Sequence, residues 1–205
     1  MTTTHSKTVA LVSGAAILIH HAQAAEAAGI AEFLAKIKSP DDHIRGPAWQ
    51  NAGPMGAVAV KPLTQTMSDP DMEIARAAKR ALWQIVRYAG RPGANKEASA
   101  VVAALLTSLS DSPVVVRRET LWMLSEIAGD AAVDRMAAQL TDPALREDAR
   151  CALTRLPGTK TTRALRKALA SAPAEFKPAL AHSLRLRGEK VAGYPSQKLV
   201  PVAIR

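Results

Sequence analysis

Apolar residues return along this chain with the spacing of one helix face. In the segment that follows Ser68, the residues Ile74, Ala78, Leu82 and Ile85 are four, four and three positions apart. Two later segments repeat this spacing, with Val116, Thr120, Leu124 and Ile127, and then with Leu145, Ala149, Leu153 and Leu156. The spacing follows an α-helix and not a strand, in which alternate residues share a face. The pattern therefore predicts three amphipathic helices.

Capping and turn residues bound each predicted helix. Each apolar run follows Ser-Asp or Thr-Asp, whose side-chain oxygens accept hydrogen bonds from free N–H groups of a first helical turn. The predicted structural caps are Asp69, Asp111 and Asp142. Gly90, Gly129 and Gly158 follow the helices, at positions where a chain commonly adopts the left-handed conformation. These residues predict where the helices begin and end.

Second apolar segments separate these helices, so the repeated unit is a pair of short antiparallel helices. The units begin at Ser39, Ser68, Ser110, Thr141 and Ser171, at intervals of 29, 42, 31 and 30 residues. A longer loop and helix between Gly90 and Leu109 account for most of the long interval. A helical period of about 30 residues predicts stacked hairpins, each of which covers the apolar face of the next. We expect an all-α fold, a right-handed α-solenoid of about four to five stacked helical hairpins.

The repeated unit resembles the HEAT repeat, in particular the short variety of phycobilisome-lyase-like proteins. An Asp, then Val/Ile-Arg, then Ala and Ala-Leu make up the pattern, which "DSPVVVRRETLWMLSEIAG" and "DPALREDARCALTRL" match. Ile44-Arg45 opens an earlier copy, whose helix we expect Gly46-Pro47 to shorten or kink. The unit of Ile74 departs from the pattern, because Ala75 stands where Arg is usual. The resemblance implies the fold and not the function, because HEAT arrays serve scaffolds, nucleic-acid enzymes and cofactor-handling enzymes alike.

The first 24 residues have the parts of a secretory signal peptide. A start with one Lys and no acid precedes twelve mostly apolar residues from Thr8, and Ala22-Gln23-Ala24 is a small-x-small cleavage site. The apolar run is shorter than the roughly 20 residues that a membrane span needs. We therefore expect cleavage after Ala24, an extracytoplasmic protein (periplasmic or secreted) and no transmembrane span in the mature chain. The alternative is an Ala-rich first helix of the fold.

The last residues differ in character from the repeats. We expect the HEAT-like solenoid to occupy residues 25–187 and a separate segment to occupy residues 188–205, where Pro195 and Pro201 stop any helix. This segment is expected to cap the last hairpin, because terminal repeats need a polar outer face. The alternative is an extended tail that docks a partner.

The chain is strongly basic, with 27 Lys and Arg against 18 Asp and Glu and a formal net charge of +9. Such a surface favours acidic partners, namely nucleic acid, anionic surfaces, acidic glycans or acidic proteins. The predicted partner-binding residues are Arg76, Lys79, Arg80, Arg87, Arg117, Arg118, Arg146, Arg150, Trp83 and Trp122. If their helices line the concave side, these charges form a stripe for an extended acidic ligand. The alternative is a set of solvated and inter-repeat charges, with the Trp side chains packed between repeats.

No motif for catalysis, a metal or a cofactor stands out. The chain has no His-Glu pair, and His43 and His182 lack Cys or Glu at ligand spacing. It has no G-x-x-x-x-G-K-[ST] phosphate loop, no G-x-S-x-G elbow and no H-E-x-x-H. Cys151, the single cysteine, is expected to pack as a small apolar residue. We predict a protein that is not an enzyme and that uses no cofactor and no metal.

Three functions remain open, and we predict the first. It is an exported, non-catalytic scaffold for protein–protein interaction, whose partner is a protein with acidic character, an acidic glycan or an anionic surface. The second is nucleic-acid binding through a basic concave face, because phosphate neutralisation dominates such binding. Export makes it less favourable, as does the 3% of aromatic residues, because base stacking uses exposed rings. The third, a bilin-lyase-like enzyme or accessory factor, is implied by the family resemblance alone.

Fractionation of a bacterial host that expresses the full chain checks the signal peptide. We expect an intact mass that begins at Ala25, in the extracytoplasmic fraction, because signal peptidase cleaves after small-x-small sites. A full-length product in the cytoplasm contradicts export and favours the nucleic-acid alternative.

Overall fold

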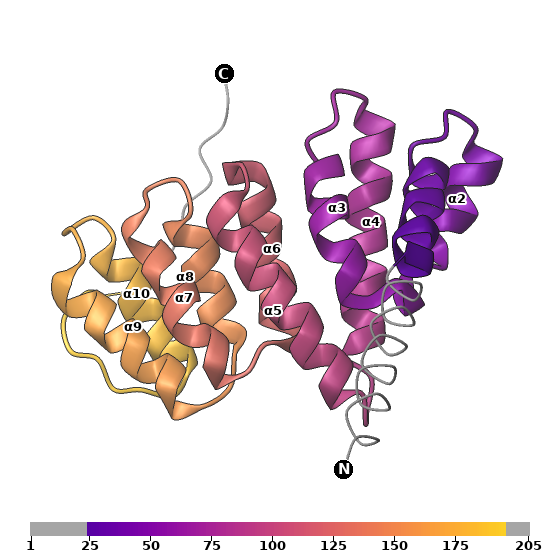
Figure 1. Ribbon diagram of the computed structural model, residues 1–205. Helices are drawn as coiled ribbons and strands as arrows, with labels where there is room; N and C mark the ends of the chain where they lie inside the picture. The colour runs from indigo at the N-terminus through magenta and orange to yellow at the C-terminus, as the bar shows by residue number, and fades with distance from the viewer. Residues whose placement is uncertain (1–23, 196–205) are drawn as a thin grey trace, which may run out of the picture.

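The chain forms a stack of helical hairpins that follow one another from end to end (Figure 1). The computed structural model describes residues 24–195, and within that range five hairpins occur and no residue lies in a strand. The first hairpin pairs a helix at residues 24–37 with α2 (Asp42–Gln50). The helix α2 contains Pro47 and is only nine residues long, which agrees with the predicted shortening. The predicted all-α solenoid of four to five hairpins is confirmed.

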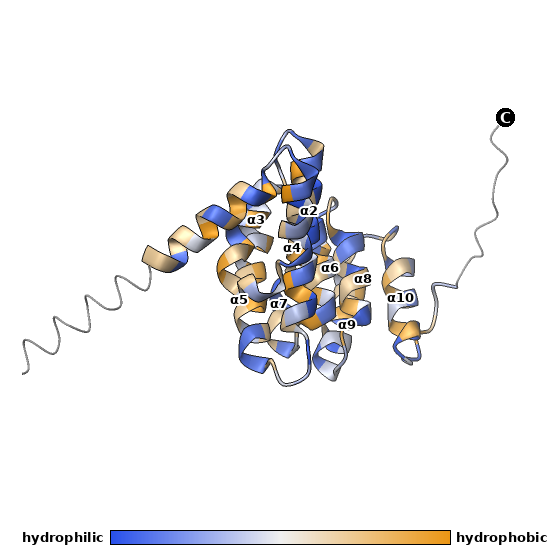
Figure 2. Cartoon of the chain, turned by 90° about the vertical axis from the view of Figure 1, so that its right-hand side faces the viewer, coloured by the Kyte–Doolittle hydropathy of each residue, from blue (hydrophilic) through white to orange (hydrophobic). Residues whose placement is uncertain are grey.

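The other four hairpins share this arrangement of two antiparallel elements. They are η1 (Gly53–Ala59) and α3 (Val60–Thr66) with α4 (Met72–Ala89); α5 (Asn95–Asp111) with α6 (Val114–Ile127); η2 (Asp130–Ala132), α7 (Val133–Ala137) and η3 (Ala138–Thr141) with α8 (Arg146–Arg155); and α9 (Thr159–Ser171) with α10 (Lys177–Leu186). The even-numbered helices contact one another in one layer, and the odd-numbered helices form the second layer (Figure 2). The hairpins therefore stack in the same orientation, each with its first element in one layer and its second element in the other.

The repeated apolar stripe forms the core between these layers. All of its predicted members are buried except Ile74 and Ile127, which are half-buried at the two ends of their helices. The one polar member, Thr120, is buried with its hydroxyl donating to the Val116 carbonyl at 2.9 Å. Burial of a large apolar side chain contributes about 1.5–3 kcal/mol, so the stripe stabilises the three hairpins that carry it.

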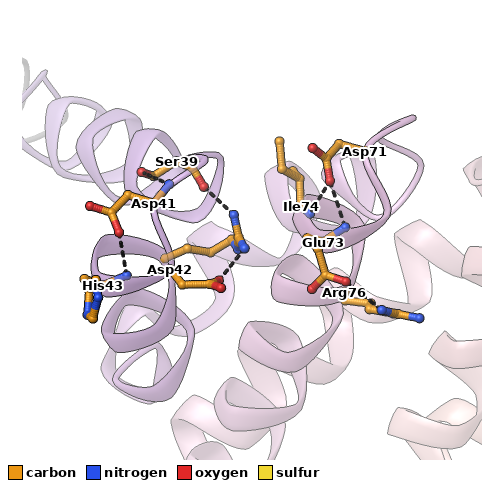
Figure 3. Close-up of polar contacts among 9 residues, drawn as sticks. Ser39, Asp41, Asp42, His43, Asp71, Glu73, Ile74 and Arg76 are labelled. Carbon is orange, nitrogen blue, oxygen red and sulfur yellow. Dashed lines mark hydrogen bonds and ion pairs between the residues drawn. The ribbon is translucent and has the colours of Figure 1, made fainter.

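The cap of α4 lies two residues later than predicted. Asp71 is the N-cap, and its carboxylate accepts hydrogen bonds from the Glu73 N–H at 2.8 Å and the Ile74 N–H at 3.3 Å (Figure 3). Asp69 instead accepts from the Asp71 N–H at 3.0 Å, in the turn before the helix. The prediction of Asp69 as the helix cap is wrong, because an Asp in the preceding turn can satisfy the N–H two residues on.

The predicted caps of α6 and α8 also lie outside the cap positions. Asp111 is the last residue of α5, and Pro113 is the N-cap of α6. Asp142 accepts from the Ala144 N–H at 2.9 Å, and Leu145 is the N-cap of α8. Both helices therefore begin later than the Asp predicts, because the turn that precedes each of them holds extra residues.

Of the three glycines predicted to be left-handed, Gly158 alone has a positive φ, of 96°. Gly90 and Gly129 have φ values of −78° and −106°, so the prediction is wrong for them. Gly90 serves a different purpose: a Cβ there would lie 2.9 Å from the Ile127 Cγ2. Close approach of α4 and α6 therefore favours glycine at this position.

Arg187, the C-cap of α10, ties the last two hairpins together. Its guanidinium donates to the carbonyls of Leu153, Thr154, Leu156 and Gly158 and to the hydroxyl of Thr162. Three of these carbonyls lie at the C-terminal end of α8, where helices leave acceptors without partners. Burial lowers the pKa of Arg187 below its usual value, and the charge of Glu189 opposes this shift.

Residues 188–195 lie against the last hairpin. Glu189 pairs with Arg166 of α9, Arg185 donates to the carbonyls of Val191 and Gly193, and Val191 packs on the core. Residues 1–23 and 196–205, which include nearly all of the predicted signal peptide and the end of the predicted C-terminal segment, lie outside the described residues. Within residues 24–195, no helix is both long and apolar enough to cross a membrane.

Gly53→Ala should disturb the packing of η1 on α4. A Cβ at Gly53 would lie 2.8 Å from Cβ and 2.9 Å from Cγ of Tyr88, and neither atom is at the far end of a flexible side chain. We expect a loss of about 1–3 kcal/mol in the free energy of unfolding, measured by urea titration. Gly29→Ala is the matched control, since nothing lies within 4 Å of its Cβ position in an exposed helix. It should stabilise by up to about 1 kcal/mol, and equal effects at both glycines would contradict the packing argument.

Candidate functional site

A cleft of about 340 Å³ lies along α4, in the layer of even-numbered helices. Its lining consists of Trp49 from α2 and of Arg76, Lys79, Arg80, Trp83, Gln84 and Arg87 from α4. Steps of three and four residues place the α4 side chains on one face of that helix. Five of the predicted partner-binding residues therefore gather in one cleft. Residue spacing did not connect Trp49, which lies in the preceding hairpin, with these side chains of α4.

Two guanidinium groups in the cleft stack on the two tryptophan rings. The Cζ atom of Arg80 is 5.1 Å from the ring centroid of Trp49, and that of Arg87 is 5.6 Å from the ring centroid of Trp83. Both arginines are exposed, whereas both rings are half-buried. Such cation–π contacts contribute about 0.5–1 kcal/mol at exposed sites. Each contact holds a guanidinium beside a ring while its N–H groups stay free to bind a carboxylate.

The other two cations of the cleft already have carboxylate partners. Arg76 pairs with Glu73 at 2.6 Å, one turn earlier on α4 (Figure 3), and Lys79 pairs with Glu119 of α6. Among the ion pairs of residues 24–195, none includes Arg80 or Arg87. The cleft therefore offers two positive charges that are not compensated by an acid within the described chain.

The predicted basic residues of α6 connect neighbouring hairpins. The Arg117 Nε donates to the Leu109 carbonyl at 2.9 Å, and its guanidinium lies 3.5 Å from the Asp142 carboxylate. Arg118 donates twice to the Ala144 carbonyl and lies 3.4 Å from the Asp148 carboxylate. Both side chains therefore hold α6 against the turn between η3 and α8 of the next hairpin.

The predicted basic residues of α8 are used in the same way. Arg146 lies 3.3 Å from the Glu175 carboxylate and over the ring of Phe176, with its Cζ 4.8 Å from the centroid. Arg150 donates to the Ser183 hydroxyl of α10 and pairs with Glu147, each at 2.8 Å. The structure therefore brings Arg117, Arg118, Arg146 and Arg150 to inter-repeat contacts, apart from the cleft.

Trp83 and Trp122 each donate a hydrogen bond to an acid on the next even-numbered helix. The Nε1 of Trp83 lies 3.4 Å from Glu119, and the Nε1 of Trp122 lies 2.9 Å from Asp148. The two acids occupy equivalent positions, each directly before the buried stripe residues Thr120 and Ala149. Trp122 has its ring under the guanidinium of Arg155, at 5.7 Å. It packs between repeats and does not line the cleft.

The groups in the cleft suit binding better than bond chemistry. Guanidinium groups donate hydrogen bonds and do not exchange protons near neutral pH. In the part of the chain that the structure describes, no three His, Cys, Asp or Glu side chains are grouped so that they could hold a metal ion. The half-buried Cys151 accepts a hydrogen bond from Arg150 at 3.3 Å.

Comparison with known proteins gives no family. No protein-family model matches the chain, and no curated protein matches it. Solved structures with a similar arrangement include an engineered protein, at 20% identity and a TM-score of 0.39 over 77% of this chain and 78% of that one. A designed armadillo repeat protein in complex with a (KR)4 peptide matches at 16% identity and a TM-score of 0.37, over 77% and 87%. Because both scores are low, the identification of a helical repeat protein depends on the helices themselves, and the HEAT resemblance stays a prediction.

Asp148→Ala should loosen the contact between α6 and α8. The change removes the acceptor of Trp122 and the partner of Arg118, and the Asp148 side chain is only 24% exposed. We expect a loss of about 1–2 kcal/mol in unfolding free energy, together with a change in Trp fluorescence. Glu147→Ala is the matched control, because Glu147 shares the first turn of α8 but pairs within its own helix and is 57% exposed. A control that loses as much as Asp148→Ala would assign the effect to the helix dipole and not to the inter-repeat contact.

Proposed function

We propose that this protein is a non-catalytic scaffold for protein–protein interaction, and that an acidic segment of the partner binds in the cleft along α4. The observation that carries the proposal is the pair of stacked guanidinium groups, Arg80 and Arg87, which have no carboxylate partner among the described residues. Charged hydrogen bonds from arginine to a carboxylate are among the stronger polar contacts that proteins make.

A protein partner fits this cleft better than a nucleic acid does. Each strand of a duplex carries a phosphate about every 3.4 Å, so tight binding uses a long row of uncompensated cations. On α6 and α8, however, Arg118, Arg146 and Arg150 already contact acids of this chain. The two free charges beside α4 match a short acidic peptide instead.

The proposal includes export and the absence of catalysis. Export is supported by the apolar segment and the Ala22-Gln23-Ala24 site of the sequence. A binding role is supported by a lining of arginine, lysine, tryptophan and glutamine, which lacks a nucleophile beside a base. An acidic glycan or an anionic surface would meet the same cations and is treated as an outcome of the test.

Photo-crosslinking from the cleft tests this function. A benzoyl-phenylalanine in place of Gln84 lines the cleft, and the same group in place of Ala170 occupies an exposed position on α9 in the other layer. In cells that make the protein, we expect adducts at position 84 that resist nuclease and glycosidase, and at least five-fold fewer after Arg80→Ala with Arg87→Ala.

The digestion of the adducts separates the alternatives. Adducts at position 84 that nuclease digests would contradict the proposal and favour nucleic-acid binding. Adducts that glycosidase digests would favour an acidic glycan. Equal adducts at positions 84 and 170 would show that the cleft has no special role.

A further inference from the structure

We propose that the cleft selects an extended, polyproline-II-like segment of the partner in which two acidic side chains lie three residues apart. One carboxylate pairs with Arg80 and the other with Arg87. This inference rests on the proposed binding function of the cleft and adds the spacing and the conformation of the bound segment.

The positions of the two arginines on α4 set the spacing. Arg80 and Arg87 are seven residues apart in one helix, so their Cα atoms share a face and are about 10.5 Å apart along the axis. Each guanidinium stacks on a different ring, Arg80 on Trp49 of α2 and Arg87 on Trp83 of α4. The spacing that the structure gives for the two sites is therefore that of their Cα atoms along α4, and two separate carboxylates match it better than one phosphate group.

A polyproline II segment matches this distance on one face. It has three residues per turn and rises about 3.1 Å per residue, so side chains three apart point the same way at about 9.3 Å. In a β-strand, side chains on one face are two or four residues apart, at about 6.7 or 13 Å. The spacing of about 10.5 Å between the arginine positions lies between these two strand distances and equals neither of them.

The walls of the cleft favour the same conformation. Aromatic walls are the usual surface for proline-rich segments in this conformation, and Trp49 and Trp83 provide them here. The residues between the two acids are therefore expected to be proline or other apolar residues.

The acids around the cleft limit how many negative charges it accepts. Glu73 and Glu119 hold Arg76 and Lys79 and leave carboxylates at the rim of the cleft. A further acidic side chain in the ligand would meet these carboxylates, and like charges at close range oppose binding. Two acids at one spacing should therefore bind better than a continuous acidic run.

Fluorescence anisotropy with labelled nonapeptides and the full chain tests the spacing. The peptides carry two Glu in a Pro/Ala background, at spacings of two, three and five, with identical composition. A fourth, longer peptide of about 18 residues is Ala-rich and helical with Glu seven apart, and a fifth is a run of six Glu. We expect the spacing of three to bind at least five-fold tighter than each of the others. Arg80→Ala and Arg87→Ala should each weaken it five- to ten-fold, and Arg87→Lys should weaken it less.

Arg163→Ala is the matched control, because Arg163 is exposed on α9 and takes part in no ion pair among the described residues. It should leave binding unchanged, and circular dichroism verifies that each variant is folded. Equal affinity for all spacings overturns the inference, and so does a preference for the helical or the six-Glu peptide. In either case the cross-linking result at position 84 still tests the proposed function separately. Absence of binding at millimolar peptide also overturns it. Binding that ignores Arg80 and Arg87 overturns both the inference and the cleft as the site.

Discussion

Leu82, Leu124 and Leu153 occupy the same place in three successive even-numbered helices, α4, α6 and α8, and each is fully buried. No single hairpin has enough surface to cover its own stripe, so each depends on the next for the burial that stabilises it. This dependence sets where the polar groups can go. Helices packed side by side bring the residues that flank the stripe together, and these residues form the ion pairs and Trp hydrogen bonds between repeats. The cleft along α4 is one of the places where such flanking residues meet.

The buried stripe was predictable because its signal is local and repeated. A spacing of four, four and three residues has one physical explanation, an amphipathic helix, and three copies of it require a stack. Pro47 likewise predicted that α2 is short. The positions of the caps were less predictable, because Asp69 and Asp71 are both able to accept an N–H two residues on. Which of them caps α4 depends on where the preceding turn ends, and packing decides that.

The candidate site was predictable in its composition but not in its limits. The cluster of Arg76, Arg80 and Arg87 on one helix face follows from their spacing. Spacing does not show that Arg118 and Arg150 meet acids and hydroxyls from the next hairpin, since those partners lie 30 and 33 residues away. The ring beneath Arg80 comes from Trp49, 31 residues earlier. Contacts of this length depend on how the hairpins stack and are absent from any one segment.

One difference between the repeats concerns the free charge of Arg80 beside α4. In α6 and α8, Glu119 and Asp148 directly precede the stripe residue and accept a hydrogen bond from the Trp of the preceding even-numbered helix. The equivalent position of α4 is Ala77, which is buried and has no acceptor to offer Trp49. Trp49 therefore meets Arg80 instead of a carboxylate, and this arginine keeps its charge available. The contact between α2 and α4 thus lacks the hydrogen bond from Trp to an acid that the later repeats have. An acid supplied by a partner would bind where the chain itself provides no carboxylate.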